Sequence, residues 1–535
     1  MKNLMLIAMC LLTLNSCKEK HEQVSKDNTY HNSAVENSDA YKSGNDYQKD
    51  FLLIIDLLKT THPAFAPSQN FPFDLDSIQA KGLNFLKDCT DFELFHLYIT
   101  KIVAKLRDGH TCVMPNVDKN GLYYLFNFRV DYPNVKLNTI SQELISNLGK
   151  NIIKINEYPV HDVINSFRDY INTDNDNIFY RQVDVPMQSF SVWKTNKYFS
   201  ADSILSLTFS DGTVIKIKPQ TYSDVMKNMK EIMAFQKSNT PKIEWHPITK
   251  LQMDKPFFYK ILDKESICYF QFMQCTDNST MRWQDYMSGK HTADSILEKQ
   301  LASIPRFDTL VLSMFNEIKN KNIKTLVVDV RYNGGGNSEL CDILLSYLKP
   351  LSSIEQGKTY LRFSPFFEKH YPELAIDAKR ALQERNIDFK MGNIYRATDL
   401  DTQEPNPEHE QFMNKYFQFN EDKNNIFKGN IVFIQGKGTY SSAGLLITSV
   451  CDNEIGIIIG DKSSYNPCHY GDILTWQLPN TKITGSVSCK IFNRPNADKC
   501  NEKYLVPSIV LETTNDDIIQ GKDKCWDWII ANYAK

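Results

Sequence analysis

TLVVDVRYNGGGN, residues 325–337, begins with a continuous apolar run and ends in three consecutive glycines. The apolar run, residues 325–330, is typical of a strand that is buried on both faces, as in a parallel sheet. The glycines let backbone N–H groups face outward with no side chain in the way, so the loop can bind an anion. That anion is a phosphate or a transient oxyanion. Nucleotide binding is disfavoured, because neither GK[ST] nor a complete GxGxxG is present.

On either side of this stretch, strands and helices alternate. Together they predict an α/β core over residues 263–535 with right-handed crossovers. Residues 351–428 interrupt the alternation with a segment that contains Phe, Tyr and Pro, a candidate lid or substrate-binding insertion. The expected strands are 267–272, 325–330, 430–435 and 455–459, and the expected helices are 310–318, 338–348 and 442–451.

A second turn of interest joins the strand 430–435 to the helix that follows it. Residues 438–444 read GTYSSAG, and Ser441 falls at the start of the helix. The helix dipole favours developing negative charge at this position, which suits a nucleophilic serine. Ser and Thr are also common helix caps, so capping by Ser441 or Thr439 is the simpler interpretation of this turn alone.

A third candidate is His110, in the sequence DGHT at residues 108–111. An apolar pattern of helical period runs over residues 92–106, and Asp-Gly is a turn signal, so His110 is expected on a loop just past a helix end. A lone histidine is more often structural than catalytic.

Together the three motifs resemble the tail-specific, or C-terminal processing, serine peptidase family. They are most similar to its branch of tricorn-core and retinoid-binding homologues. Residues 504–510 and 517–528 also resemble the family's final strand and helix, and the resemblance extends over about residues 47–530. It implies a crotonase-like core of ββα layers, a peptide or protein substrate and no cofactor. Ser441 would attack the scissile carbonyl, and the amides of Gly335 and Ser442 would form the oxyanion hole.

The general base differs within this family. Many members use a lysine in Gly-x-x-Thr-x-Gly-Lys after the next strand, but here residues 460–466 read GDKSSYN and Asn466 holds the lysine position. Lys462 is an alternative base that would need burial to lower its pKa. The tricorn-like branch uses a histidine from the N-terminal region. His110 matches it and is favoured, because imidazole acts near neutral pH.

The acid that orients His110 is expected to be Glu502, which resembles the branch's acidic member by position, with Asp498 as the second choice. The branch also places a serine just before its histidine, where this chain has Gly109. Water or Asp108 could take the place of that serine. Asp329, Arg331 and Asn333 are expected to brace the glycine loop.

The missing lysine and serine keep an alternative function open. In this alternative, the protein is a non-catalytic ligand- or peptide-binding lipoprotein on the same fold.

The N-terminus resembles a bacterial lipoprotein signal over residues 1–17. Lys2 precedes an apolar run, residues 4–14, that is too short to span a bilayer. Cys17 follows a small residue and would carry the lipid, although an ordinary signal that contains a cysteine is the alternative. The protein is then expected to be exported and membrane-anchored, in the periplasm or at the cell surface. Residues 18–45, polar and charged, predict a flexible tether.

Two further domains are expected between tether and core. Residues 46–119 predict a helical N-terminal domain that carries the His110 loop. Residues 120–262 predict a strand-rich domain, in which strand 151–156 and helix 161–170 resemble half of a PDZ-like module or a generic β-turn-α unit. A PDZ-like module would recognise a substrate's C-terminus by strand addition.

The amino-acid composition limits which partners and cofactors are expected. The 61 basic and 64 acidic residues give a net charge of −3, which argues against nucleic acid as a partner. Of 12 cysteines, the ten beyond Cys10 and Cys17 could form disulfides or remain as buried thiols. No HExxH, Cys/His quartet or EF-hand spacing is present, and Cys468-His469 is an isolated pair, so no metal is expected.

Overall fold

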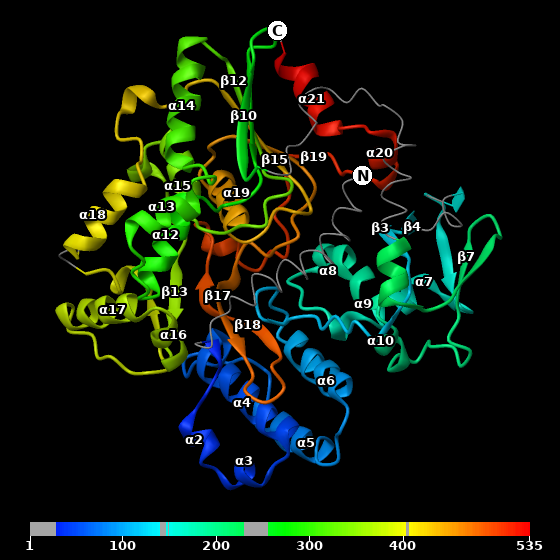
Figure 1. Ribbon diagram of the computed structural model, residues 1–535. Coiled ribbons are helices and arrows are strands. Elements are labelled where there is room, and N and C mark those ends of the chain that lie inside the picture. Colours follow the sequence, from blue (N-terminus) through cyan, green and yellow to red (C-terminus); the bar gives the residue numbers. More distant parts are fainter. Residues whose placement is uncertain (1–27, 140–145, 148, 229–254, 403–405, 535) are drawn as a thin grey trace.

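The computed structural model describes residues 28–139, 146–147, 149–228, 255–402 and 406–534. The predicted signal peptide and Cys17 lie outside these residues. Figure 1 shows three regions: the N-terminal helices in blue, a lobe in cyan, and a core whose sheets and helices come from the rest of the chain. The fold is mixed α/β, with a helical N-terminal region and a sheet-rich core, as expected.

The core is built on a six-stranded sheet in the order β10-β11-β12-β15-β16-β19. β10 pairs antiparallel with β11, and every later pair is parallel. All five residues of β12 are buried, which confirms the strand expected from its apolar run. The strands are β10 (Phe257–Leu262), β11 (Ile267–Phe272), β12 (Thr325–Asp329), β15 (Asn430–Gln435), β16 (Ile457–Gly460) and β19 (Ile509–Val510).

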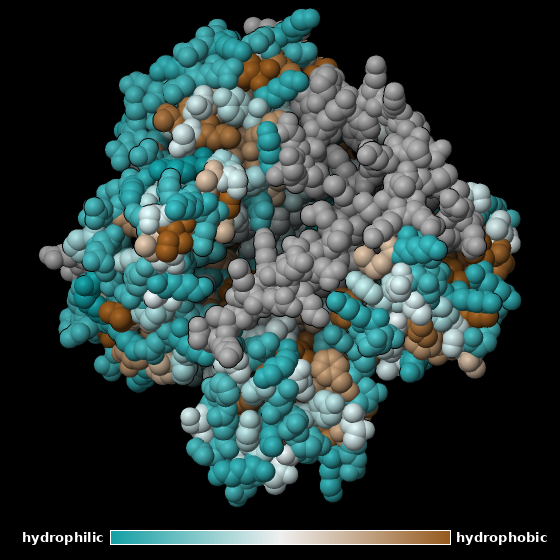
Figure 2. Space-filling model, viewed as in Figure 1, coloured by the Kyte–Doolittle hydropathy of each residue, from teal (hydrophilic) through white to brown (hydrophobic). Residues whose placement is uncertain are grey.

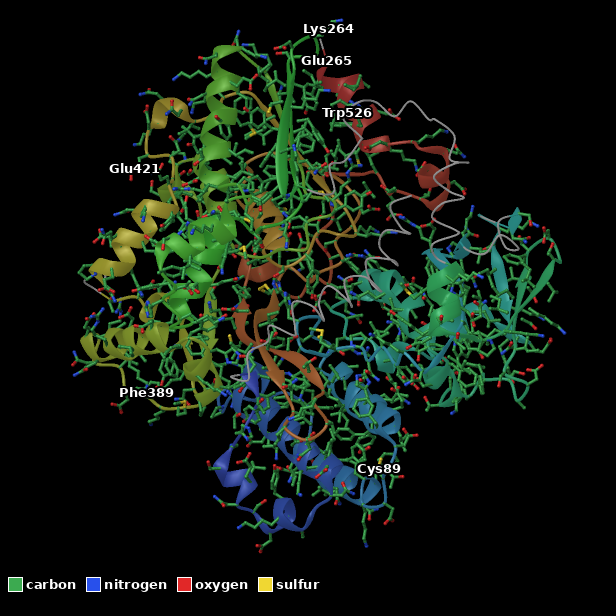
Figure 3. The ribbon with its side chains drawn as sticks, viewed as in Figure 1. Cys89, Lys264, Glu265, Phe389, Glu421 and Trp526 are labelled. Atoms are coloured by element: carbon green, nitrogen blue, oxygen red, sulfur yellow. A yellow bond between two sulfur atoms is a disulfide. The ribbon has the colours of Figure 1, made fainter. Side chains whose placement is uncertain are left out.

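Helices cover both faces of this sheet because its strands are apolar on both. Leu326 and Val328 of β12 face a core shared with helices α14 (Phe307–Asn320), α15 (Glu339–Ser346) and α19 (Ser442–Asp452). Val327 faces the other side, where Trp526 packs edge-on against Tyr269 at 5.9 Å between ring centroids. Figure 3 shows Trp526 on its helix beside the sheet.

The C-terminal helix expected over residues 517–528 is in fact two helices. They are α20 (Asn515–Gln520) and α21 (Lys524–Tyr533). Gly521 between them has a φ of +70°, and the Asp523 side chain accepts a hydrogen bond from the Trp526 amide, so a new helix starts there.

A second sheet runs β1-β18-β13-β14, with β17 also paired to β18. Two of its strands, β13 and β14, come from residues 351–428, so part of the expected insertion belongs to the core. β1 comes from the N-terminal region and pairs antiparallel with β18, Cys112 opposite Ser486. The strands are β1 (Cys112–Val113), β13 (Thr359–Arg362), β14 (Ile394–Arg396), β17 (His469–Gln477) and β18 (Thr484–Phe492). Helices α16 (Pro365–His370), α17 (Pro372–Glu384) and α18 (Pro407–Tyr416) complete this segment.

The N-terminal helices start earlier than expected, which corrects the tether predicted over residues 18–45. Tyr30 is buried, its amide donates to the carbonyl of Gln477, and its hydroxyl donates to Asp56. These contacts fix the chain from residue 28 against the core. The helices are α2 (Ser33–Glu36), α3 (Asp39–Ser43), α4 (Asp46–Thr61), α5 (Leu75–Phe85) and α6 (Phe92–Ala104).

The lobe coloured cyan in Figure 1 combines several short strands with four helices. A four-stranded antiparallel sheet, β6-β5-β7-β8, packs with four helices around buried Phe167, Phe179 and Trp193. Its likeness to a PDZ module, and that of the core to a crotonase fold, remain predictions. The strands are β5 (Ile152–Ile155), β6 (Tyr158–Pro159), β7 (Leu205–Phe209) and β8 (Val214–Ile217); the helices are α7 (Val160–Asn165), α8 (Asp176–Gln182), α9 (Asp184–Met187) and α10 (Phe190–Lys194).

On the face shown in Figure 2, the described surface is mainly hydrophilic, and its hydrophobic residues lie in small scattered groups. Among the helices that the structure describes, none combines the length and the apolar composition that crossing a bilayer requires.

Candidate active site

Ser441 lies at the turn between β15 and α19 in an unusual backbone conformation. Its φ is +52° and its ψ is −128°, a region that a residue with a Cβ rarely adopts. Within the described residues its hydroxyl makes no hydrogen bond, so it does not cap the helix. Thr439 does not cap either, because its hydroxyl donates to the carbonyl of Val330 at 2.7 Å. The simpler interpretation of this turn, helix capping, is therefore wrong for both residues.

The glycine loop after β12 lies directly against Ser441. A Cβ built on Gly335 would stand 2.5 Å from the Cβ of Ser441, and Gly335 has a φ of +100°, so only glycine fits. As expected, Arg331 and Asp329 brace the loop. The guanidinium bonds Asp329 at 2.7 Å and Asp523 at 2.9 Å, which ties the end of β12 to the start of α21.

The two expected oxyanion-hole amides are in different states. Among the described residues the Ser442 N–H has no partner, and it stands at the first position of α19. The Gly335 N–H donates to Oδ1 of Asn333 at 2.9 Å. Asn333 is completely buried, and its hydrogen bond to the Gly335 amide holds the loop in its conformation. Only the Ser442 amide is therefore free to bind an oxyanion without displacing another acceptor.

His110 reaches this turn through the pairing of β1 with β18. The Ser486 hydroxyl donates to the carbonyl of His110 at 2.7 Å, and the imidazole stacks between the rings of Tyr440 (4.8 Å) and His469 (5.5 Å). Tyr440 immediately precedes Ser441, so the imidazole contacts the turn that carries the serine. No hydrogen bond joins these two side chains within the described residues, and the buried Nε2 of His110 has no partner there.

Asp108 anchors the His110 loop through hydrogen bonds to both of its carboxylate oxygens. One carboxylate oxygen accepts from His62 (3.1 Å), Thr111 (2.5 Å) and Ser488 (2.6 Å), and the other accepts from the His110 amide (2.9 Å). Burial on its own would raise the pKa of Asp108. The hydrogen bond and charge of His62, with the charge of His110, outweigh it and hold this pKa below its usual range.

Tyr440 and Asp174 form a second contact with the histidine. The Tyr440 hydroxyl donates to Oδ2 of Asp174 at 2.6 Å and lies 3.4 Å from Nδ1 of His110, while the Gly109 amide donates to Oδ1 of Asp174. Desolvation, together with the charge of Asp108, raises the pKa of Asp174 to about 6. Sequence reasoning missed Asp174, which lies in the middle of the chain and carries no motif. Tyr440 lies in the turn of residues 438–444, where nothing in the sequence pattern distinguishes its hydroxyl.

The acidic partners expected from the family do not contact His110. Glu502 bonds Arg494 at 2.8 Å, its side chain is 51% exposed, and Asp498 is exposed as well. Arg494 in turn bonds Asp452, so Glu502 belongs to a separate ion cluster. Asp108 and Tyr440 take the place beside the imidazole instead.

The alternative base, Lys462, is exposed, so it lacks the burial that would suit it to the role. Asn466 is in the lysine position, and its carbonyl accepts from Nδ1 of His469 at 3.0 Å. Loss of hydration, followed by the charge of His110, lowers the pKa of His469 to about 3, so this stacked ring is neutral at ordinary pH.

The isolated pair Cys468-His469 is structural in two ways. Cys468 forms a disulfide with Cys500, and His469 stacks on His110. Eight other cysteines of the described chain are free thiols, five of them buried. No group of three His, Cys, Asp or Glu side chains suited to a metal ion occurs among the described residues.

Comparison with known proteins identifies similar chains. Residues 301–471 match the family model described as Peptidase family S41. A search of curated proteins gives no match. Solved structures of CPAF are similar at the level of the fold: the mature protein with lactacystin has a TM-score of 0.54, 15% identity, and coverage of 92% of this chain and 98% of that one. A point mutant of CPAF has a TM-score of 0.56, 14% identity, and coverage of 93% and 99%.

Proposed function

The chain belongs to peptidase family S41 and is a serine-type peptidase, and we propose that Ser441 is its nucleophile and His110 its general base. The observation that carries this proposal is the state of Ser441. A strained backbone at φ +52° holds Ser441 against the glycine loop at the N-terminus of α19, and among the described residues its hydroxyl has no hydrogen-bond partner. Strain of this kind persists only where surrounding structure enforces it, and it concentrates at functional sites.

The environment of His110 suits a base. Asp108 and the Tyr440 hydroxyl both lie on its Nδ1 side, at 3.8 Å and 3.4 Å, which favours a proton on Nδ1. The other nitrogen, Nε2, then carries the lone pair that accepts the proton of Ser441. Closure of the site on substrate binding would bring Nε2 and the hydroxyl into hydrogen-bond contact, as catalytic contacts often tighten only in the complex.

The reaction follows the usual order of acyl transfer. The Ser441 oxygen bonds the scissile carbonyl carbon while its proton moves to Nε2, and the leaving amine then takes that proton as the C–N bond breaks. Water hydrolyses the resulting ester with His110 again as the base. The oxyanion binds the free N–H of Ser442 first, and the N–H of Gly335 when it exchanges Asn333 for the substrate oxygen. One such donor is worth about 3 kcal/mol in the transition state.

The substrate class follows from the family and the site. A peptide or an unfolded exported protein would supply the scissile carbonyl. Export and a lipid anchor on Cys17 are part of this proposal and rest on the sequence of residues 1–17.

A fluorophosphonate probe tests the nucleophile, because it labels only an activated serine. Wild type is expected to be labelled, Ser441→Ala to remain unlabelled, and His110→Ala to react at least about 100-fold more slowly. Casein hydrolysis by the same three proteins tests the peptidase reaction itself. If the wild type remains unlabelled and leaves casein intact, the non-catalytic binding lipoprotein becomes the better description.

A further inference from the structure

Gly109 has an unusual neighbour at the position before the histidine. A Cβ built on Gly109 would stand 2.2 Å from the hydroxyl oxygen of Tyr440 and 3.4 Å from Oδ2 of Asp174. No real side chain tolerates the first of these distances. The space that a serine side chain would need is therefore already filled by another hydroxyl, which Tyr440 extends from the nucleophile's own turn.

We infer that Tyr440 and Asp174 are positioning residues for His110, taking over the role of a serine and a distant acid. The inference rests on the proposed function of Ser441 and His110. The chain of contacts runs from Asp174 Oδ2 to the Tyr440 hydroxyl (2.6 Å) and from that oxygen to Nδ1 of His110 (3.4 Å). A phenol has one proton, and the short contact commits it to Asp174. The oxygen lone pair is left to accept from the Nδ1–H of His110, which fixes the tautomer in which Nε2 is the base.

Asp108 does not perform this task by itself. Its Oδ2 already accepts three side-chain donors and its Oδ1 accepts the His110 amide, and the distance from Oδ1 to Nδ1 is 3.8 Å. That carboxylate thus holds the loop and supplies negative potential. The Tyr440 oxygen is the nearer acceptor for the imidazole N–H.

Asp174 is itself held in place from two directions. Its Oδ1 accepts the Gly109 amide at 3.0 Å and its Oδ2 accepts the phenol, so the carboxylate bridges the His110 loop and the Ser441 turn. Desolvation and the charge of Asp108 raise the pKa of Asp174 to about 6, so it is ionised only above that pH. Desolvation also raises the pKa of Tyr440 well above 10, which keeps the phenol protonated as a donor.

The test is the rate of fluorophosphonate labelling of the full chain, with probe concentration varied so that binding and the chemical step separate. Tyr440→Phe and Asp174→Asn are each expected to slow the chemical step about 10- to 100-fold, with probe binding changed less than threefold. The double variant should be no slower than the slower single variant, because both act through one contact to Nδ1. Tyr465→Phe is the matched control. It removes a buried hydroxyl that bonds Gln435 of β15, and should leave the rate unchanged.

The pH dependence separates positioning from simple loss of structure. The groups that face His110 are Asp108, Tyr440 with Asp174, and the neutral ring of His469. The deficit of Asp174→Asn should be full above pH about 6 and should shrink below it, where the wild-type carboxyl is protonated as well. Nitrogen NMR of the His110 ring should show the Nδ1–H tautomer in wild type and a mixture in Tyr440→Phe.

The outcomes discriminate between the two proposals. If the wild-type protein is not labelled at all, the proposed function is wrong. Wild type that is labelled, with Tyr440→Phe and Asp174→Asn at the wild-type rate, leaves the proposed function intact and overturns the positioning role. Additive losses in the double variant, or a deficit that does not change with pH, also overturn it.

Discussion

The turn that carries Ser441 and the loop that carries His110 are built on opposite principles. Ser441 has a strained backbone and a hydroxyl without a partner among the described residues. His110 sits above Asp108, a fully buried carboxylate that accepts four hydrogen bonds. The proposed nucleophile is thus kept free of hydrogen bonds among the described residues, while the loop of the proposed base is held by the hydrogen bonds of Asp108. Substitutions should therefore affect mainly reactivity at the first site, and both reactivity and stability at the second.

Substitution of Ser441 should have the largest effect on activity. Ser441→Ala and Ser441→Gly are both expected to lose labelling and peptide hydrolysis by 10⁴-fold or more, roughly the loss seen when a serine nucleophile is removed. Glycine adopts φ +52° without strain, so Ser441→Gly should be more stable than Ser441→Ala by about 1 kcal/mol. Urea unfolding of the two variants measures this difference. Equal stability would mean that the turn is not strained.

Substitution of Asp108 should have the largest effect on stability. Asp108→Asn retains the shape but removes a buried charge from its donors, and should cost about 3–5 kcal/mol of unfolding free energy together with much of the labelling rate. Asp88→Asn, at an exposed site, is the control and should stay within about 0.5 kcal/mol of wild type. If Asp108→Asn proved as stable as Asp88→Asn, the contrast between the two regions would not hold.

The lowered pKa of Asp108 also predicts how the free energy of unfolding depends on pH. The folded-state pKa of Asp108 is depressed, so its contribution is fully present above the unfolded-state value of about 4 and is lost as the pH falls through the folded-state value. The difference in unfolding free energy between wild type and Asp108→Asn should therefore be constant from pH 5 to 8 and decrease below pH 4. Denaturant titrations across this range measure it.

The disulfide Cys468–Cys500 should matter for stability more than for chemistry. It closes a loop with a sequence separation of 32, and the lost entropy of the unfolded chain is expected to stabilise the folded state by about 4 kcal/mol. Replacing both cysteines by serine should lower the unfolding free energy by about that amount and change the labelling rate only a few-fold. Cys89→Ser is the control, at a free cysteine in the connection between α5 and α6 (Figure 3).

The smallest effects are expected at the residues that the family pattern singles out but that do not contact His110. Glu502→Gln and Lys462→Ala should retain labelling rates within about twofold of wild type, because one side chain bonds Arg494 and the other is exposed. A loss of 100-fold at Glu502 would mean that the acid of the tricorn-like branch acts here after all. The contacts of Asp108 and Tyr440 would then be insufficient.

Several elements were predictable from local sequence. The strand at residues 267–272 has the expected limits, the strand at 430–435 does too, and the helix expected at 442–451 ends one residue later. Apolar runs bounded by glycine turns report local burial, and that information is contained in the run itself. For the same reason the turns that carry Ser441 and His110 could be recognised from their flanking elements. The ordered structure of residues 28–45 could not be predicted from local sequence, because it depends on hydrogen bonds to the distant residues Gln477 and Asp56.

The sequence by itself thus determined which residues are chemically suited to attack a carbonyl and on which turns they lie. Only the tertiary structure decided what surrounds them. β1 pairs with a strand more than 370 residues away, Asp174 comes from another lobe, and Asn333 occupies the Gly335 amide. Such contacts depend on how separately folded segments pack, and the free energy that selects one packing is a sum over the whole core, which no short pattern of residues records.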